Sequence, residues 1–151
     1  MQEDSESDAV VLQARIIAFV RAFGLYQPDQ TPCGQPLSVS EAHAVTELDR
    51  DGPLTQVELA GRLRLTKSTV SRLVDQLTAR GWVQRRKRDG DGRLVWLELT
   101  DAGRHAAGEL STARAARFSS LLEAIPAGRR QTVVDALTLL VKAADEQLDQ
   151  H

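Results

Sequence analysis

Apolar residues recur with the period of a helix near both ends of the chain. Over residues 8–23 they spread around more than one face of the helix that they predict. A long helix is expected from Thr100 to about Leu122, and Pro126 suits the first turn of a last helix. That last helix keeps an apolar stripe as far as Leu148. The first and last of these helices therefore need a further surface to cover them.

The middle of the chain carries the start signals of three helices. Ser38 is followed three residues later by Glu41, and Thr55 by Glu58, so each pair can form a capping box. The first pair opens a helix that ends at 51–53, and the second opens a short helix over 57–63. Thr66 caps the next helix, which ends at Gly81. Two capped helices joined by a short turn predict a helix-turn-helix. The second helix buries a stripe spaced i, i+3, i+4 and i+7, namely Val70, Leu73, Val74 and Leu77.

Strand-forming residues follow directly. Two runs, 82–86 and 94–99, flank the turn-rich residues 89–92 and predict a hairpin. In the second run Val95, Leu97 and Leu99 face one side of the hairpin. A basic hairpin after a helix-turn-helix is a wing. The expected fold class is therefore mainly α with a small β-wing (α+β).

Composition narrows the classes of function. The 151 residues are 42% hydrophobic and 26% charged, an ordinary balance for one globular domain with helical extensions. Residues 1–7 suggest a disordered acidic tail without the basic start of a signal peptide, and no apolar run approaches a membrane span of roughly 18 residues. A cytoplasmic protein is expected. Cys33 alone forms no intrachain disulfide, and no phosphate loop or nucleophile triad is present, so we expect neither a cofactor nor enzyme activity.

The charge is distributed unevenly along the chain. Residues 62–93 contain ten basic and three acidic side chains, whereas the rest of the chain contains nine basic and eighteen acidic ones. A basic stretch in an acidic chain is typical of a face that binds phosphates. The alternative is a solvated face of a helix and hairpin, and charge alone does not decide between the two.

Three consecutive segments resemble one known family. They read LSVSEAHAVTEL, then GPLTQVELAGRLRLTKSTVSRLVDQLTARGWVQRR, then DGRLVWLELTDAG. In this order, over residues 37–103, they resemble the MarR family of winged-helix transcription regulators. The last segment matches the family's wing signature, D-x-R followed by a strand that ends in L-T-x-x-G. The predicted flanking helices also fit the family in number and place.

The resemblance implies a homodimer that binds an inverted-repeat operator in double-stranded DNA, as a repressor that a small-molecule effector releases. In the family, the N-terminal helix and the two C-terminal helices interlock between subunits. By this resemblance, residues 8–36 and 101–151 form the helical dimerisation region and 37–100 the winged helix-turn-helix. The apolar faces of the first and last helices agree with this assignment. The alternative is that these faces pack within one chain, which would be a monomer.

The resemblance also places the helix from Lys67 in the major groove of DNA. Its inward apolar stripe leaves six residues facing outward: Lys67, Ser68, Thr69, Ser71, Arg72 and Gln76. We expect Arg72 to pair with a guanine through two hydrogen bonds, and Ser68, Thr69 and Ser71 to make mixed contacts. The alternative for these hydroxyls is a role in starting the helix.

In the wing, Arg93 matches the family arginine that enters the minor groove, whose narrow form attracts a guanidinium. Asp91 matches the aspartate that braces the wing. Four further residues are expected along the DNA backbone, some of them only solvated: Arg85, Arg86, Lys87 and Arg88.

Three residues are candidates for a sensor. Zinc-responsive members of the family carry a cysteine in the loop where Cys33 stands, an adjacent Glu-His pair, and histidines after the wing. Here Glu41 and His43 are two residues apart and do not share a helix face, and Glu41 also serves as a capping partner. Peroxide-sensing members use a lone cysteine in the first helix, whereas Cys33 stands in a proline-rich loop and no adjacent residue is basic. A small-molecule effector with Cys33 incidental is the preferred hypothesis, and a redox or zinc sensor is the alternative.

Two other classes of function are weighed. Related winged domains can form the N-terminal half of an acetyltransferase, which would require about 150 further residues. A winged helix can also serve protein interaction alone. Such a module has no need of the basic residues between Arg85 and Arg93, which favour DNA.

Overall fold

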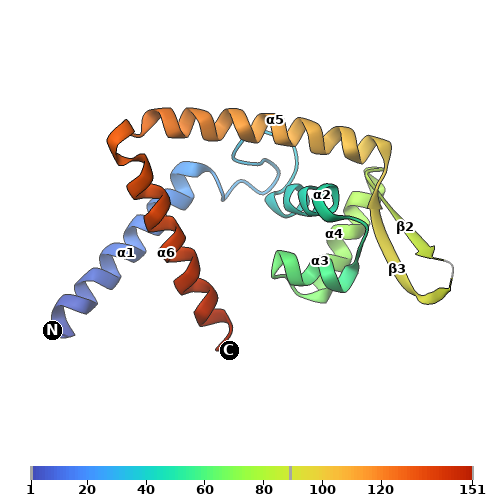
Figure 1. Ribbon diagram of the computed structural model, residues 1–151, viewed down its shortest axis with the longest axis horizontal. Coiled ribbons are helices and arrows are strands. Elements are labelled where there is room, and N and C mark those ends of the chain that lie inside the picture. The colour runs from blue at the N-terminus through green and yellow to red at the C-terminus, as the bar shows by residue number, and fades with distance from the viewer. Residues whose placement is uncertain (1, 89, 151) are drawn as a thin grey trace. The chain divides into compact units, whose positions relative to one another are not determined.

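Helices make up most of the chain, and a small antiparallel sheet interrupts them (Figure 1). The computed structural model describes residues 2–88 and 90–150, and the chain divides into two units, 1–114 and 115–151. The elements are α1 (Gln2–Phe23), α2 (Val39–Asp51), β1 (Leu54–Thr55), α3 (Gln56–Leu63), α4 (Lys67–Ala79), β2 (Val83–Arg88), β3 (Asp91–Leu99), α5 (Asp101–Ala124), the 3-10 helix η1 (Ala127–Arg129) and α6 (Arg130–Leu148). The predicted fold class is confirmed.

Both predicted capping boxes are present. The Ser38 hydroxyl accepts the backbone N–H of Glu41 at 3.1 Å, and the Glu41 carboxylate accepts that of Ser38 at 3.2 Å. Thr55 and Glu58 form the same reciprocal pair at the start of α3, at 3.2 and 2.8 Å. Each box satisfies two N–H groups that the first turn of a helix leaves without intrahelical partners. These side chains therefore set where α2 and α3 begin.

The predicted helix-turn-helix is confirmed. α3 ends at Arg64, whose φ of 54° is in the left-handed region, and its N–H donates to the carbonyls of Ala60 and Gly61. The Thr66 hydroxyl accepts the backbone N–H of Thr69 at 3.2 Å and starts α4. The two helices are thus joined by a turn of three residues, 64–66.

The sheet has three strands in the order β1-β3-β2, all antiparallel. The hairpin of β2 and β3 was predicted, and its strands extend further towards the tip than the sequence pattern indicates. The two-residue β1 was not predicted, because it exists only through its pairing with β3, where Leu54 lies opposite Leu97. The register between β2 and β3 shifts between Lys87 and Arg88, close to the tip.

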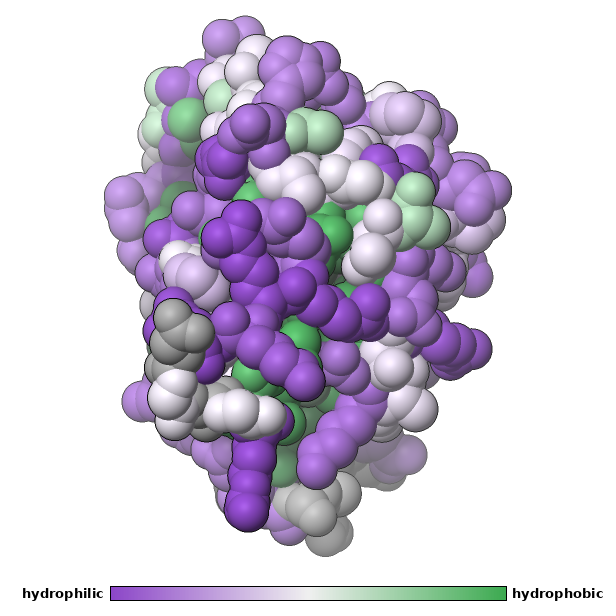
Figure 2. Space-filling model, turned by 90° about the vertical axis from the view of Figure 1, so that its right-hand side faces the viewer, coloured by the Kyte–Doolittle hydropathy of each residue, from purple (hydrophilic) through white to green (hydrophobic). Residues whose placement is uncertain are grey.

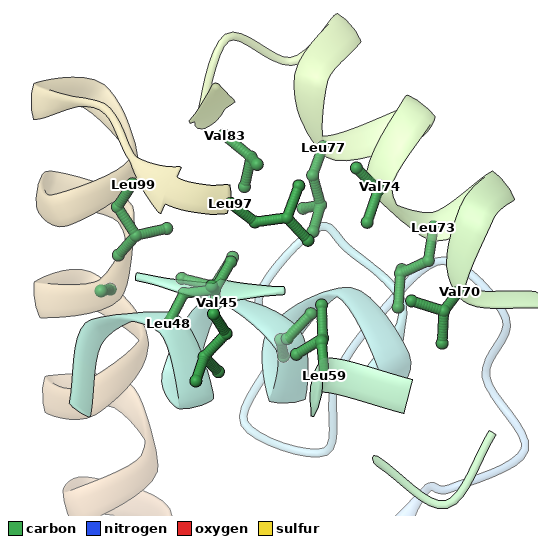
Figure 3. Close-up of a cluster of buried hydrophobic side chains, with 14 of the residues drawn as sticks. Val45, Leu48, Leu59, Val70, Leu73, Val74, Leu77, Val83, Leu97 and Leu99 are labelled. Carbon is green, nitrogen blue, oxygen red and sulfur yellow. The ribbon is translucent and has the colours of Figure 1, made fainter. Parts of the chain in front are cut away.

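The core of the first unit lies where α4 packs against α2, α3 and the sheet (Figure 3). The predicted α4 stripe is confirmed, since all four of its residues are buried. In Figure 3 these side chains point towards Leu59 of α3, Val45 of α2 and Leu97 of β3. On the inner face of the hairpin Leu97 and Leu99 are buried, whereas Val95 is exposed. This core holds α4 with its polar side turned to solvent.

One glycine explains the end of the L-T-x-x-G segment. A Cβ at Gly103 would lie only 2.1 Å from the carbonyl oxygen of Trp82, so no larger residue fits there. The same carbonyl accepts the backbone N–H of Thr100 at 2.9 Å. The Thr100 hydroxyl donates to the carbonyl of Gly81 at 2.6 Å and accepts the N–H of Gly103 at 3.1 Å. These contacts join the end of α4, the start of β2 and the start of α5.

The start of the chain differs from the prediction. A disordered tail over 1–7 was expected, but α1 already begins at Gln2; Met1 lies outside the described residues. Acidic residues are favourable near a helix N-terminus, because they face the positive end of the helix dipole. The acidic composition that suggested disorder therefore also favours a helix here.

The apolar faces of the terminal helices are uncovered. In α1, Val10, Val11, Leu12, Ile16 and Phe19 are between 39% and 59% exposed. The second unit has no buried residue among those described, and many of its apolar side chains, including Phe118, Leu122 and Val134, are exposed. Neither unit covers these faces by itself, so they still need a further surface, as the sequence indicated. None of the described helices is long and apolar enough to cross a bilayer.

Candidate nucleic-acid interface

The solvent side of α4 carries the predicted base-reading residues. Lys67, Ser68, Arg72 and Gln76 are exposed, whereas Thr69 and Ser71 are half-buried. All six lie off the buried stripe, as predicted. Within the described part of the chain, no carboxylate lies within ion-pair distance of Arg72. Its guanidinium therefore retains its full hydrogen-bonding capacity for a base edge or a phosphate.

Three hydroxyls at the start of α4 bond to one another. Thr66 Oγ1 lies 2.8 Å from Thr69 Oγ1 and 3.2 Å from Ser68 Oγ, and it also accepts the Thr69 N–H. Ser68 and Thr69 thus take part in starting the helix, which is the alternative role that the sequence left open. Because a hydroxyl both donates and accepts, these groups can still contact DNA as well.

Two of the wing arginines are paired with carboxylates. Arg85 Nη2 lies 2.7 Å from Asp75 Oδ1 of α4, which ties the wing to the helix. Arg86 Nε lies 2.5 Å from Glu98 Oε1, and that carboxylate also accepts a hydrogen bond from Gln84 at 2.7 Å. The four basic residues of β2 are therefore not equivalent as phosphate contacts.

The other basic residues of the wing are exposed to solvent. Lys87, Arg88 and Arg93 are exposed, and the Arg88 guanidinium lies 4.0 Å from the centre of the Trp96 ring. The side chain of Asp91 lies outside the described residues, so its bracing role stays a prediction. Figure 2, which faces the hairpin end, shows long hydrophilic side chains over much of this surface.

Two other arginines of the basic stretch, Arg62 and Arg80, are paired with acidic residues of α2. Arg62 of α3 pairs with Glu47 at 3.1 Å and with Asp51 at 2.5 Å, both on α2. Arg62, and then Arg50, lower the pKa of the Asp51 carboxyl through these hydrogen bonds. The basic stretch therefore overstates the charge available to a phosphate backbone.

Arg80, which follows α4, contacts both a carboxylate and an aromatic ring. Its Nε lies 2.6 Å from Glu41, and its guanidinium lies 5.0 Å from the centre of the Trp82 ring. The acidic partner could not be predicted from the sequence alone, because Glu41 lies 39 residues before Arg80 along the chain. The pairing of Arg86 with Glu98, by contrast, could have been predicted once the hairpin register was known.

The structure does not assemble the sensor candidates. Cys33 is free and half-buried, with its Sγ 3.1 Å from the Thr31 hydroxyl. Glu41 is buried and already bonded to Ser38 and Arg80. His43 lies on the exposed side of α2; partial desolvation and then Arg114 lower its pKa, while Glu47 acts in the opposite sense. Among the described residues no group of three or more His, Cys, Asp or Glu could hold a metal ion.

Known proteins resemble this chain in sequence and in fold. The model of the MarR family matches residues 37–95. The HTH-type transcriptional regulator ML2140 of Mycobacterium leprae is 29% identical over 114 residues, which cover 74% of this chain and 78% of that protein.

Two solved structures share the fold. FabT of Streptococcus pneumoniae, solved in complex with DNA, has a TM-score of 0.68 at 18% identity and covers 97% of both chains. BpsR of Bordetella bronchiseptica, whose DNA binding is regulated by 6-hydroxynicotinic acid, has a TM-score of 0.67 at 20% identity, covering 88% of this chain and 91% of that one. The curated relatives are described as transcriptional regulators, in agreement with the prediction that the chain is not an enzyme. Residues 37–95 of this chain thus match the model of the MarR family, its curated relatives are HTH-type transcriptional regulators, and it shares its fold with solved structures over most of its length.

Proposed function

We propose that this protein is a homodimeric repressor that binds an inverted-repeat operator in double-stranded DNA and is released by a small-molecule effector. One observation carries the proposal. The core buries the whole apolar stripe of α4 and leaves Lys67, Arg72 and Gln76 exposed, next to a hairpin that carries exposed cations.

The exposed side of α4 suits the major groove. A recognition helix directs its N-terminal residues to base edges. Arg72 can bind the O6 and N7 atoms of a guanine, and Gln76 can bind an adenine. Lys67 at the helix start, with the hydroxyls of Ser68, Thr69 and Ser71, suits the flanking phosphates.

The wing suits the neighbouring backbone and minor groove. Arg93 is exposed on β3, close to the hairpin tip, and a narrow minor groove favours such a guanidinium. Lys87 and Arg88 are the better phosphate contacts of β2, because Arg85 and Arg86 are already paired. FabT, with the same fold, was solved bound to DNA, which supports this assignment.

The uncovered apolar helices support the homodimer. α1 and α6 each expose a row of large apolar side chains, and monomeric proteins rarely leave such surfaces in water. A second copy of the chain offers the same faces in return. A two-fold dimer presents two recognition helices, which explains the expected inverted repeat with half-sites about one helical turn apart.

A shift of labelled DNA from the region upstream of the protein's own gene tests the proposal. We expect a single complex of one dimer per site, a footprint with two half-sites, and weaker binding as the salt concentration rises. Screening aromatic acids is a reasonable start for the effector, because BpsR responds to one. A footprint of one isolated half-site, or a monomer in sedimentation at micromolar concentration, would contradict the dimer.

A further inference from the structure

The outer face of the hairpin carries an arrangement that the proposed function has not used. Trp96 of β3 lies directly opposite Arg86 of β2, and Gln84 lies opposite Glu98. The register shifts between Lys87 and Arg88, so Arg88 lies opposite Asp91 in the ladder, yet its guanidinium lies over the Trp96 ring.

The two arginines on this face have different partners. Arg86 pairs with Glu98 at 2.5 Å, so its charge is balanced by a carboxylate. The guanidinium of Arg88 lies over the Trp96 ring instead, 4.0 Å from its centre. No carboxylate of the described residues lies within ion-pair distance of Arg88. The ring thus holds this cation in place without neutralising it.

The indole is not held in this position by its own polar group. Its Nε1 is buried and has no hydrogen-bond partner among the described residues. A buried N–H without a partner costs stability, and a buried tryptophan usually finds one. A leucine would cover the same face without that cost. The favourable contact that Trp96 makes on this side of the hairpin is therefore between the face of its ring and the Arg88 guanidinium.

We propose that Trp96 is a positioning residue that holds Arg88 ready for a phosphate of the DNA backbone beside the wing. The inference rests on the proposed DNA-binding function and adds the residue that orders one of its phosphate contacts. A free arginine loses side-chain freedom when it binds, and an arginine already stacked on a ring loses less. The ring therefore lowers the entropic cost of the contact while Arg88 stays charged.

The test is the affinity for a fluorescently labelled duplex of random sequence, measured at several salt concentrations, because a phosphate contact does not depend on sequence. The proteins are the wild type, Trp96→Leu, Trp96→Phe, Arg88→Ala and the double variant Trp96→Leu/Arg88→Ala. Arg86→Ala is the matched control on the same strand and face, and it should weaken binding less than Arg88→Ala.

We expect Trp96→Leu to weaken binding about two- to five-fold, as removal of an exposed cation–π pair predicts. The slope of log affinity against log salt should stay unchanged, whereas Arg88→Ala should reduce it by about 0.9 for each phosphate that is no longer neutralised. Trp96→Phe should restore part of the affinity, since it keeps a ring. In the Arg88→Ala background, Trp96→Leu should have no further effect.

Two results would overturn the inference. Equal weakening by Trp96→Leu with and without Arg88 would mean that Trp96 acts on the wing in another way. Unchanged affinity and slope in Arg88→Ala would mean that Arg88 contacts no phosphate. A melting curve checks folding, and if Trp96→Leu unfolds, the same cycle with Trp96→Phe decides. Failure of the wild type to bind any duplex would instead contradict the proposed function.

Discussion

The helices α4 and α6 carry similar apolar stripes, but the stripe of α4 is buried and that of α6 is exposed. In α4 the four stripe residues are at most 4% exposed, because α2, α3 and the sheet cover them. In α6 Val133, Val134, Leu137 and Val141 are between 36% and 58% exposed. A stripe with a helical period thus shows that a helix needs a partner, without showing that the partner belongs to the same chain.

A charge in the α6 stripe tests the proposed second chain most strongly. Leu137→Asp should weaken the homodimer on the order of 3–5 kcal/mol, because a carboxylate would be buried in the interface without a partner. Leu139→Asp is the control, since Leu139 lies on the other side of α6 and is 69% exposed. Sedimentation at several concentrations measures the change, and a dimer untouched by Leu137→Asp would remove α6 from the interface.

Leu77→Ala tests how much the buried stripe of α4 contributes to stability. Leu77 is fully buried in the core, so its truncation should cost about 2–5 kcal/mol of unfolding free energy. Val57→Ala in the same unit should change that free energy by less than about 0.5 kcal/mol, because Val57 is 64% exposed. Denaturant titration compares the two variants. Similar losses of stability in both would mean that the two sites do not differ in burial as described.

A smaller effect is expected on the DNA side. Arg93→Ala should weaken operator binding by about 1–3 kcal/mol and leave the melting curve unchanged. Arg50→Ala serves as the control, since this exposed arginine is bound to Glu47 and Asp51 on α2. Fluorescence anisotropy with the footprinted site measures both. Wild-type affinity in Arg93→Ala would exclude the wing tip from the interface.

The smallest effect is expected at Cys33. The described residues around it hold no metal-ligand group, and its nearest polar partner is the Thr31 hydroxyl. Cys33→Ser should therefore bind the operator and respond to the effector like the wild type. Band shifts of both proteins with peroxide, with zinc and with neither are the measurement. A change in binding that depends on Cys33 would favour the redox or zinc alternative.

Local patterns were enough to predict most elements of the winged domain. The capping boxes at Ser38 and Thr55, the buried stripe of α4 and the turn-rich tip are all encoded within a few residues of each other. β1 was missed because its two residues are a strand only through β3. The predicted start of α1 was wrong because acidic composition is compatible with both a tail and a helix N-terminus.

The interface was predicted less completely than the fold. The outward residues of α4 follow from the helical period, and they lie where the period places them. Which arginines remain available for DNA depends on partners such as Asp75, Glu98 and Trp96, which are brought near by the hairpin register. Charge counted along the chain cannot show which cations are already balanced.

The junction at Gly103 has a mechanical consequence. Trp82, Gly81 and Thr100 are bonded to one another through their backbones and one hydroxyl, and the missing side chain of Gly103 brings α5 onto the same carbonyl. These contacts hold the three elements close together. We therefore expect a tilt of the first turn of α5 to be transmitted to the start of the wing and the end of α4, which carry the DNA-reading residues.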